Sequence, residues 1–120
     1  MKVTQFEDLN CWKESRVLVS KIYSLTTTGS FSKDFGLKDQ IQRASVSIMT
    51  NIAEGFHRYH DKETIRFLDF AQSSASEVRS LLYVAQDLGY ITNRIAEKLR
   101  DTVAKIRSQI LALIKHYRSR

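Results

Sequence analysis

The chain has 120 residues, of which 42% are hydrophobic, and a formal net charge of +6 at pH 7. This length predicts one domain, residues 1–120, with a single core. With no proline, four glycines and one cysteine, the composition favours long helices and excludes an intramolecular disulfide framework. The polar start "MKVTQFEDLN" and the lack of an apolar run of about 20 residues predict a soluble, cytoplasmic protein with no membrane partner.

The first two helices are predicted over residues 7–28 and 35–54. Apolar residues recur at helical spacing in both. Gly29 suits the end of the first helix, and Ser32 or Asp34 can cap the start of the second. The apolar rows are Leu9, Trp12, Val19, Ile22 and Tyr23 in the first helix, and Leu37, Ile41, Ala44, Ile48 and Ile52 in the second.

The third helix is predicted over residues 62–88, with Asp61 as its N-cap and Gly89 as its stop. It carries two apolar seams, whereas a helix packed only inside one bundle needs a single stripe. The first seam is Ile65, Leu68, Ala71, Ala75, Val78, Leu82 and Ala85. The second predicts an oligomer interface through Phe67, Phe70, Ser74, Leu81 and Val84, continuing to Leu88.

The fourth helix is predicted over residues 93–117, with Thr92 as N-cap. Its apolar residues Ile95, Leu99, Val103, Ile106, Ile110, Leu113 and Tyr117 follow spacings of four and three. Short connections between long helices make neighbouring helices antiparallel. The predicted fold is therefore all-α, an up-down-up-down antiparallel four-helix bundle.

The positive charge is concentrated near the end of the chain. Residues 1–93 contain 11 Lys and Arg against 11 Asp and Glu, whereas residues 94–120 contain 8 against two. A basic helical stripe can neutralise nucleic-acid phosphates without reading base sequence. The alternative is a solvated face that aids solubility and forms interhelical ion pairs. The candidate nucleic-acid-binding residues are Arg94, Lys98, Arg100, Lys105, Arg107, Lys115 and Arg118.

A row of polar residues accompanies the apolar row of the second helix. It consists of Gln40, Arg43, Ser47, Asn51 and Glu54. We interpret the row as a structural hydrogen-bond network that fixes packing, because such networks specify geometry when every member is satisfied. Glu54 lies near the unfavourable end of the helix dipole and needs a donor such as Arg58.

Catalytic and metal sites have little support in the sequence. Glu54 and His57 form one Glu-x-x-His pair, but a di-metal bundle site requires two. The alternative is a single metal ion held by His57, His60 and Asp61, which fall in a predicted loop. Cys11 has no histidine nearby in sequence and suits a small buried residue. We therefore expect no enzymatic activity, no metal and no cofactor.

Several motifs together resemble a known family. They are "FEDLNCW" near the start, "Q-x-x-R-A-S-x-S-I-x-x-N-I-A-E-G" in the second helix, "F-L-x-x-A" in the third, and "L-G-Y-I" before the fourth. The chain resembles the 23S ribosomal RNA intervening-sequence proteins, which are similar to the accessory variability determinant of diversity-generating retroelements. The resemblance implies a four-helix bundle that assembles into a homopentameric ring. It also implies nucleic acid or a reverse transcriptase as partner in the retroelement branch.

Two functional hypotheses follow. The first is a non-enzymatic oligomeric scaffold with a basic surface that binds RNA or DNA through backbone phosphates. The second is an oligomeric protein–protein interaction module, for example a reverse-transcriptase accessory protein, that does not contact nucleic acid. A ring would repeat the basic stripe in every subunit and strengthen weak phosphate contacts by multivalency.

Overall fold

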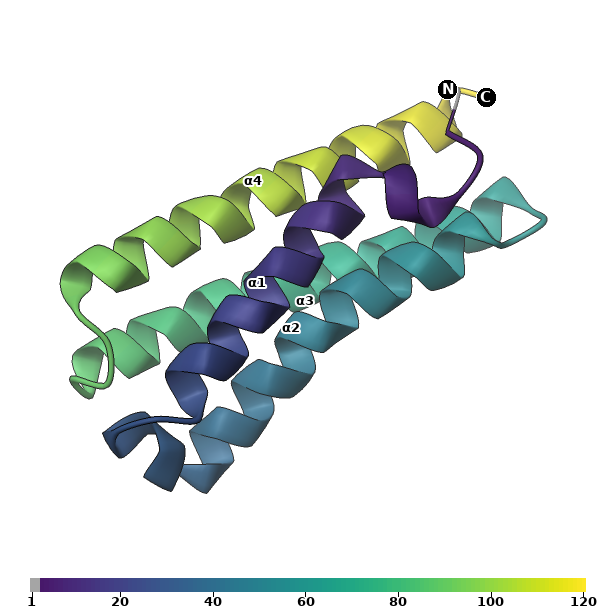
Figure 1. Cartoon of the computed structure of the whole chain (residues 1–120). Helices are drawn as coiled ribbons and strands as arrows, with labels where there is room; N and C mark the ends of the chain where they lie inside the picture. Colours follow the sequence, from purple (N-terminus) through teal and green to yellow (C-terminus); the bar gives the residue numbers. More distant parts are fainter. Residues whose placement is uncertain (1–2) are drawn as a thin grey trace.

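Four long helices dominate residues 3–120, the part of the chain that the computed structural model describes (Figure 1). They are α1 (Asn10–Thr26), α2 (Phe35–Phe56), α3 (Asp61–Asp87) and α4 (Asn93–Arg118), with short 3₁₀ turns at Phe6–Asp8 and Ser30–Lys33. Successive helices run antiparallel, so the predicted up-down-up-down bundle is confirmed. The bundle measures 47 × 22 × 20 Å, and the two chain ends lie at the same end of it (Figure 1).

The helix boundaries agree with the prediction at two caps and differ at two others. The Asp34 carboxylate accepts a hydrogen bond from the Leu37 N–H at 3.1 Å, and the Thr92 hydroxyl accepts one from the Ile95 N–H at 3.1 Å. α1 begins later than predicted because Leu9 is extended, with a ψ of 129°. The N-cap of α3 is His60 rather than Asp61, which instead occupies the first turn.

The core fills the space between all four helices. The predicted row of α2 is buried apart from a half-buried Leu37, and the first seam of α3 is buried apart from a half-buried Ile65. In α1 the buried stripe is Cys11, Ser15, Leu18, Ile22 and Thr26, so the prediction missed Leu18 and wrongly included Tyr23, which is exposed. Within residues 3–120, no helix combines the length and the apolar character that crossing a bilayer requires.

Gly55 lies inside α2 rather than ending it, because the helix continues to Phe56. A Cβ atom at this position would come within 3.0 Å of the Phe67 Cβ and 3.2 Å of the Thr64 carbonyl oxygen. The Thr64 hydroxyl also donates a hydrogen bond to the Gly55 carbonyl at 2.9 Å. The glycine of the "NIAEG" motif is therefore required by the close approach of α2 to the start of α3.

The two loops at the other end of the bundle contact each other. The ring of Phe31, from the α1–α2 connection, is buried and stacks on Tyr90 with ring centroids 5.1 Å apart. The Tyr90 hydroxyl donates a hydrogen bond to the Asp34 carboxylate at 2.8 Å. The tyrosine of the "LGY" motif thus links the α3–α4 loop to the start of α2.

Candidate nucleic-acid interface

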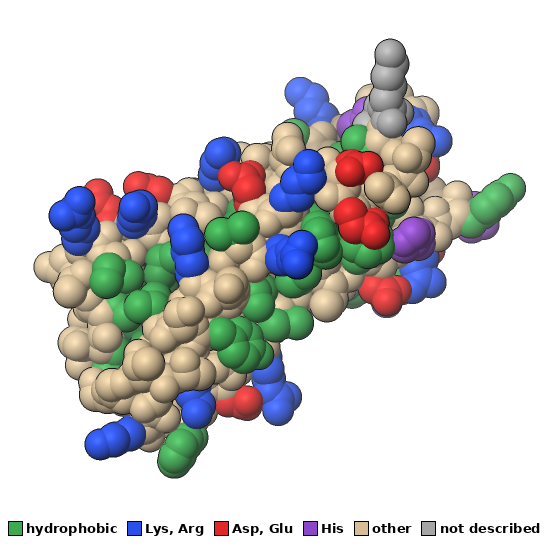
Figure 2. Space-filling view, viewed as in Figure 1, with side chains coloured by type: hydrophobic (Ala, Val, Ile, Leu, Met, Phe, Trp, Pro, Cys, Tyr) green, Lys and Arg blue, Asp and Glu red, His purple; other side chains and the backbone are tan. Residues whose placement is uncertain are grey.

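The basic residues of α4 do not form one stripe but divide between two sides of the helix. Lys98 lines a groove between α1 and α4, and Lys105 pairs with Glu14 of α1. Arg100 and Arg107 instead reach toward α3. Arg94, Lys115 and Arg118 are exposed to solvent. Figure 2 shows the face that carries α1 and α4, where Lys and Arg side chains follow α4 with acidic side chains among them.

The α1 side of α4 is partly neutralised by its own ion pair. The Lys105 ammonium lies 2.9 Å from the Glu14 carboxylate. Partial burial raises the pKa of Glu14, but the hydrogen bonds of Lys105 and Gln109 and the charge of Lys105 together outweigh burial and bring the pKa below its ordinary value. Glu14 therefore remains ionised at neutral pH and offsets the charge of Lys105. This pair is an interhelical ion pair of the kind that the alternative interpretation of the charges expects.

The α3 side of α4 holds its arginines with neutral side chains. The Arg100 guanidinium donates to the Gln86 amide oxygen at 2.6 Å and stacks over the Tyr83 ring at 4.0 Å. The Arg107 Nε donates to the Gln72 amide oxygen at 3.0 Å. An amide oxygen positions a guanidinium without cancelling its charge. These two cations therefore stay available to an anionic partner.

Arg79 is a further basic residue of this side, and the sequence analysis did not select it. It lines a groove of about 560 Å³ between α3 and α4, together with Arg107. Most of the other lining residues are small: Ala75, Ser76, Ser80, Ala104 and Ser108. Arg79 lies seven residues from both Gln72 and Gln86, and this spacing in the sequence indicates that the three share one face of the helix. Arg79 lies outside the basic segment 94–120, from which the candidate binding residues come.

The polar row of α2 does not form one continuous network among the described residues. Its centre is a small cluster in which Asn51 donates to the Ser47 carbonyl at 2.8 Å and to the Ser47 hydroxyl at 3.0 Å. The Ser47 hydroxyl in turn hydrogen-bonds the Ser74 hydroxyl of α3 at 2.9 Å. The network prediction is corrected to this three-residue clasp, because the other members have different partners.

The remaining residues of the row form exposed pairs. Gln40 donates to the Glu77 carboxylate of α3 at 3.3 Å. Arg43 pairs with Asp39 at 3.0 Å within α2. Glu54 pairs with Arg58 at 2.8 Å, as the sequence analysis anticipated. Exposed pairs of this kind contribute little to stability.

The second seam of α3 is exposed in part. The side chains of Phe70 and Val84 are 45% and 41% exposed, and Phe67 is half-buried beneath the Arg58 guanidinium at 4.5 Å. Leu81 is only 8% exposed and packs in the core of its own chain, so little of its side chain is available to another subunit. Ser74 bonds to Ser47 inside the chain. An apolar strip therefore remains on α3, narrower than predicted.

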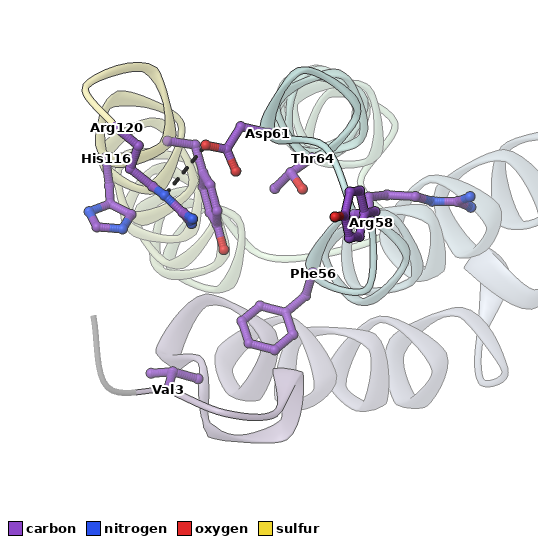
Figure 3. Close-up of a pocket in the computed structure, with 9 residues that line it drawn as sticks. Val3, Phe56, Arg58, Asp61, Thr64, His116 and Arg120 are labelled. Atoms are coloured by element: carbon purple, nitrogen blue, oxygen red, sulfur yellow. Dashed lines mark ion pairs between the residues drawn. The ribbon is translucent and has the colours of Figure 1, made fainter.

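A second cavity, of about 430 Å³, lies at the end of the bundle where the α2–α3 turn meets the end of α4 (Figure 3). Asp61 and Arg120 point toward each other across it and form an ion pair at 3.4 Å. The Arg120 guanidinium lies 5.4 Å from the Tyr117 ring. Burial raises the pKa of the Tyr117 phenol. The charges of Asp61 and Arg120 therefore offset each other. The arginines of the α3/α4 groove are instead held by glutamine side chains or exposed to solvent.

No cluster of metal ligands supports the alternative site at His57, His60 and Asp61. Among residues 3–120, no three or more His, Cys, Asp and Glu side chains gather closely enough to hold a metal ion. His57 and His60 are exposed to solvent. Cys11 is buried, and burial raises the pKa of its thiol to about 11. A thiol that is buried and protonated at neutral pH is a weak nucleophile.

Comparison with known proteins gives a family match and a structural match. A model of the 23S rRNA-intervening sequence protein family matches residues 7–112. A similar crystal structure is that of a protein of unknown function from the S23 ribosomal protein family of Bacteroides thetaiotaomicron VPI-5482. The two chains are 24% identical with a TM-score of 0.81, and the match covers 88% of this chain and 95% of the other. That likeness shows a shared fold. No curated protein matches the chain.

Proposed function

The chain belongs to the 23S rRNA-intervening sequence protein family, and from that premise we propose that it is a non-enzymatic, oligomeric scaffold that binds RNA or DNA. Binding uses the basic surface of α4 and contacts backbone phosphates. The observation that carries the proposal is that Arg100 and Arg107 are held by glutamine amides rather than by carboxylates. Their positive charge is therefore positioned but not neutralised, which suits a polyanion.

The interaction is electrostatic, because phosphate contacts release counterions from the nucleic acid. The sequence of α4 contains no recognised base-reading motif, and we expect the binding to be independent of base sequence. The contribution of one subunit is small. Assembly into a homopentameric ring would repeat the basic surface, so that several weak contacts act on one strand.

A salt titration tests the proposal. Wild-type protein is expected to bind a short fluorescent RNA of mixed sequence at about 50 mM salt and to lose affinity steeply toward about 200 mM. Replacing Arg94, Lys98, Lys105 and Arg107 together by Gln is expected to reduce the slope of log affinity against log salt by about three to four. The variant should keep the wild-type oligomer size. Absence of binding by the wild-type protein at low salt would reject the proposal.

The second candidate function is a protein–protein interaction module, for example an accessory protein of a reverse transcriptase. The exposed apolar strip of Phe70, Val84 and Leu88 on α3 favours it. An apolar strip rimmed by polar residues is typical of a surface that binds protein. The same titration separates the two functions, because a purely protein-binding module leaves the RNA unbound at every salt concentration.

A further inference from the structure

Two arginines, Arg79 and Arg107, line the groove between α3 and α4, and Arg100 lies further along the same pair of helices. On α3, Gln72, Arg79 and Gln86 recur every seven residues, which is about 10.5 Å of helix rise. On α4, Arg100 and Arg107 have the same spacing. Arg100 is bonded to Gln86 and Arg107 to Gln72. The two helices run antiparallel (Figure 1). On α3, Arg79 comes midway in sequence between Gln72 and Gln86, the partners of the two α4 arginines.

Both glutamines are themselves held in place. The Gln86 amide nitrogen donates to the Asn93 side-chain oxygen at 3.0 Å, which turns its own oxygen toward Arg100. The Gln72 amide nitrogen donates to the Asp69 carboxylate at 2.9 Å, which turns its oxygen toward Arg107. The glutamine therefore stands between Asp69 and the guanidinium. Ordering of these side chains before binding lowers the entropic cost of holding a ligand.

The charge of the three arginines is not cancelled within the described chain. Among residues 3–120, Arg79, Arg100 and Arg107 form no ion pair within 4.0 Å, whereas Lys105 on the α1 side is paired with Glu14. Guanidinium groups bind phosphate oxygens through charge-assisted and often bidentate hydrogen bonds. The groove thus offers cations of the type that phosphate recognition uses, and one of them, Arg107, is held in place by Gln72.

The space between the arginines is open and lined with hydroxyl groups. The cavity of about 560 Å³ is lined by Ser76 and Ser80 of α3 and by Ser108 of α4. All three serines are exposed to solvent. Serine hydroxyls can donate to phosphate oxygens. Tyr83, which is 47% exposed, also lines the cavity.

We propose that the α3/α4 groove is an anchoring site for a phosphate group of a nucleic-acid strand, held by Arg79 and Arg107 with Arg100 beside it. The inference rests on the proposed nucleic-acid function and names the site at which it occurs. It moves the centre of binding away from the outer stripe of α4, Arg94 and Lys98. The phosphate lies between the helices, where the serine hydroxyls complete its coordination.

Single charge removals test this location. Arg79→Gln is expected to weaken binding of the short fluorescent RNA about tenfold and to lower the salt slope by about one. Lys62→Gln removes the same charge from an exposed position at the start of α3, outside the groove, and serves as the matched control, with an expected change below about twofold. Gln72→Glu keeps every arginine but places a carboxylate beside Arg107, and it is expected to weaken binding in the same direction as Arg79→Gln. Thermal unfolding confirms that each variant is folded.

A second ligand separates the possible failures. Inorganic pyrophosphate should compete with the RNA and raise the Tm of the wild-type protein but not of Arg79→Gln. Equal losses of RNA affinity in Arg79→Gln and Lys62→Gln would overturn the groove site and leave the proposed function standing. If the wild-type protein binds pyrophosphate through Arg79 but does not bind RNA, the groove is an anion-binding site, and the proposal that its ligand is a nucleic-acid phosphate is overturned. If the wild-type protein binds neither RNA nor pyrophosphate, both the inference and the proposed function are overturned.

Discussion

At the scale of single residues, Gly55 shows that a motif glycine can be required by packing rather than by backbone conformation. Alanine is about 1 kcal/mol better than glycine inside a helix. At position 55, however, its Cβ would meet the Thr64 carbonyl oxygen at 3.2 Å and the Phe67 Cβ at 3.0 Å. Overpacking of this kind costs about 1–3 kcal/mol. Gly55→Ala is therefore expected to destabilise the protein, measured as a lower midpoint in urea unfolding.

Gly36 provides the matched control for this prediction. It also lies in α2, but a Cβ atom there would meet only the Asp34 carboxylate, at 3.9 Å. Gly36→Ala is expected to stabilise the protein by about 0.5–1 kcal/mol, because only the helix propensity changes. Equal effects of the two substitutions would contradict the packing explanation for Gly55.

The buried thiol of Cys11 makes a prediction about alkaline pH. Burial raises the pKa of Cys11 from 9.0 to about 11, against the opposing effect of backbone hydrogen bonds. Between these values the unfolded chain loses the thiol proton while the folded chain keeps it, so stability falls as pH rises. The expected loss is about 2–3 kcal/mol between about pH 9 and 11. Cys11→Ala should remove this pH dependence of the free energy of unfolding, measured by urea unfolding. If the variant keeps the wild-type pH dependence, the prediction is rejected.

At the scale of elements, the contact between α2 and α3 depends on the clasp of Ser47, Asn51 and Ser74 more than on the exposed pairs beside it. Asn51→Leu removes the donor to Ser47 and is expected to cost about 1 kcal/mol. Glu54→Leu removes an ion pair whose two side chains are 59% and 42% exposed, so its expected effect is within about 0.5 kcal/mol. Urea unfolding of both variants distinguishes them. A loss for Glu54→Leu as large as that for Asn51→Leu would contradict this ranking.

Helix α4 illustrates how far helical periodicity predicts a functional surface. Seven-residue spacings relate Lys98 to Lys105 and Arg100 to Arg107, so the sequence alone separates these two pairs around the helix. It could not show that one face meets Glu14 of α1 and the other meets glutamines of α3, because those partners come from distant parts of the chain. Arg79 is absent from the sequence-based candidates for the same reason, because its place in the groove depends on which helix lies opposite it.

At the scale of the whole molecule, the apolar strip on α3 predicts self-association. Phe70, Val84 and Leu88 are exposed on one chain, and a ring with a head-to-tail interface needs two different patches on each subunit. Light scattering is expected to give a mass about five times 13.9 kDa. Phe70→Glu should lower that mass, because a charge in an apolar interface is costly, whereas the exposed Tyr59→Glu should leave it unchanged. A wild-type mass near 13.9 kDa would reject the ring.

The sequence by itself determined the four helices, most of their buried faces and the family. These features depend on helix propensity, apolar periodicity and capping residues, and each of these is determined by residues close together in the sequence. Only the tertiary structure decided which polar side chains meet. It joined Asn51 to Ser47 and Ser47 to Ser74, placed Leu81 in the core, and brought Arg79 and Arg107 to one groove. Such pairings depend on the rotation and register of packed helices, which small residues such as Gly55 control and periodicity does not encode.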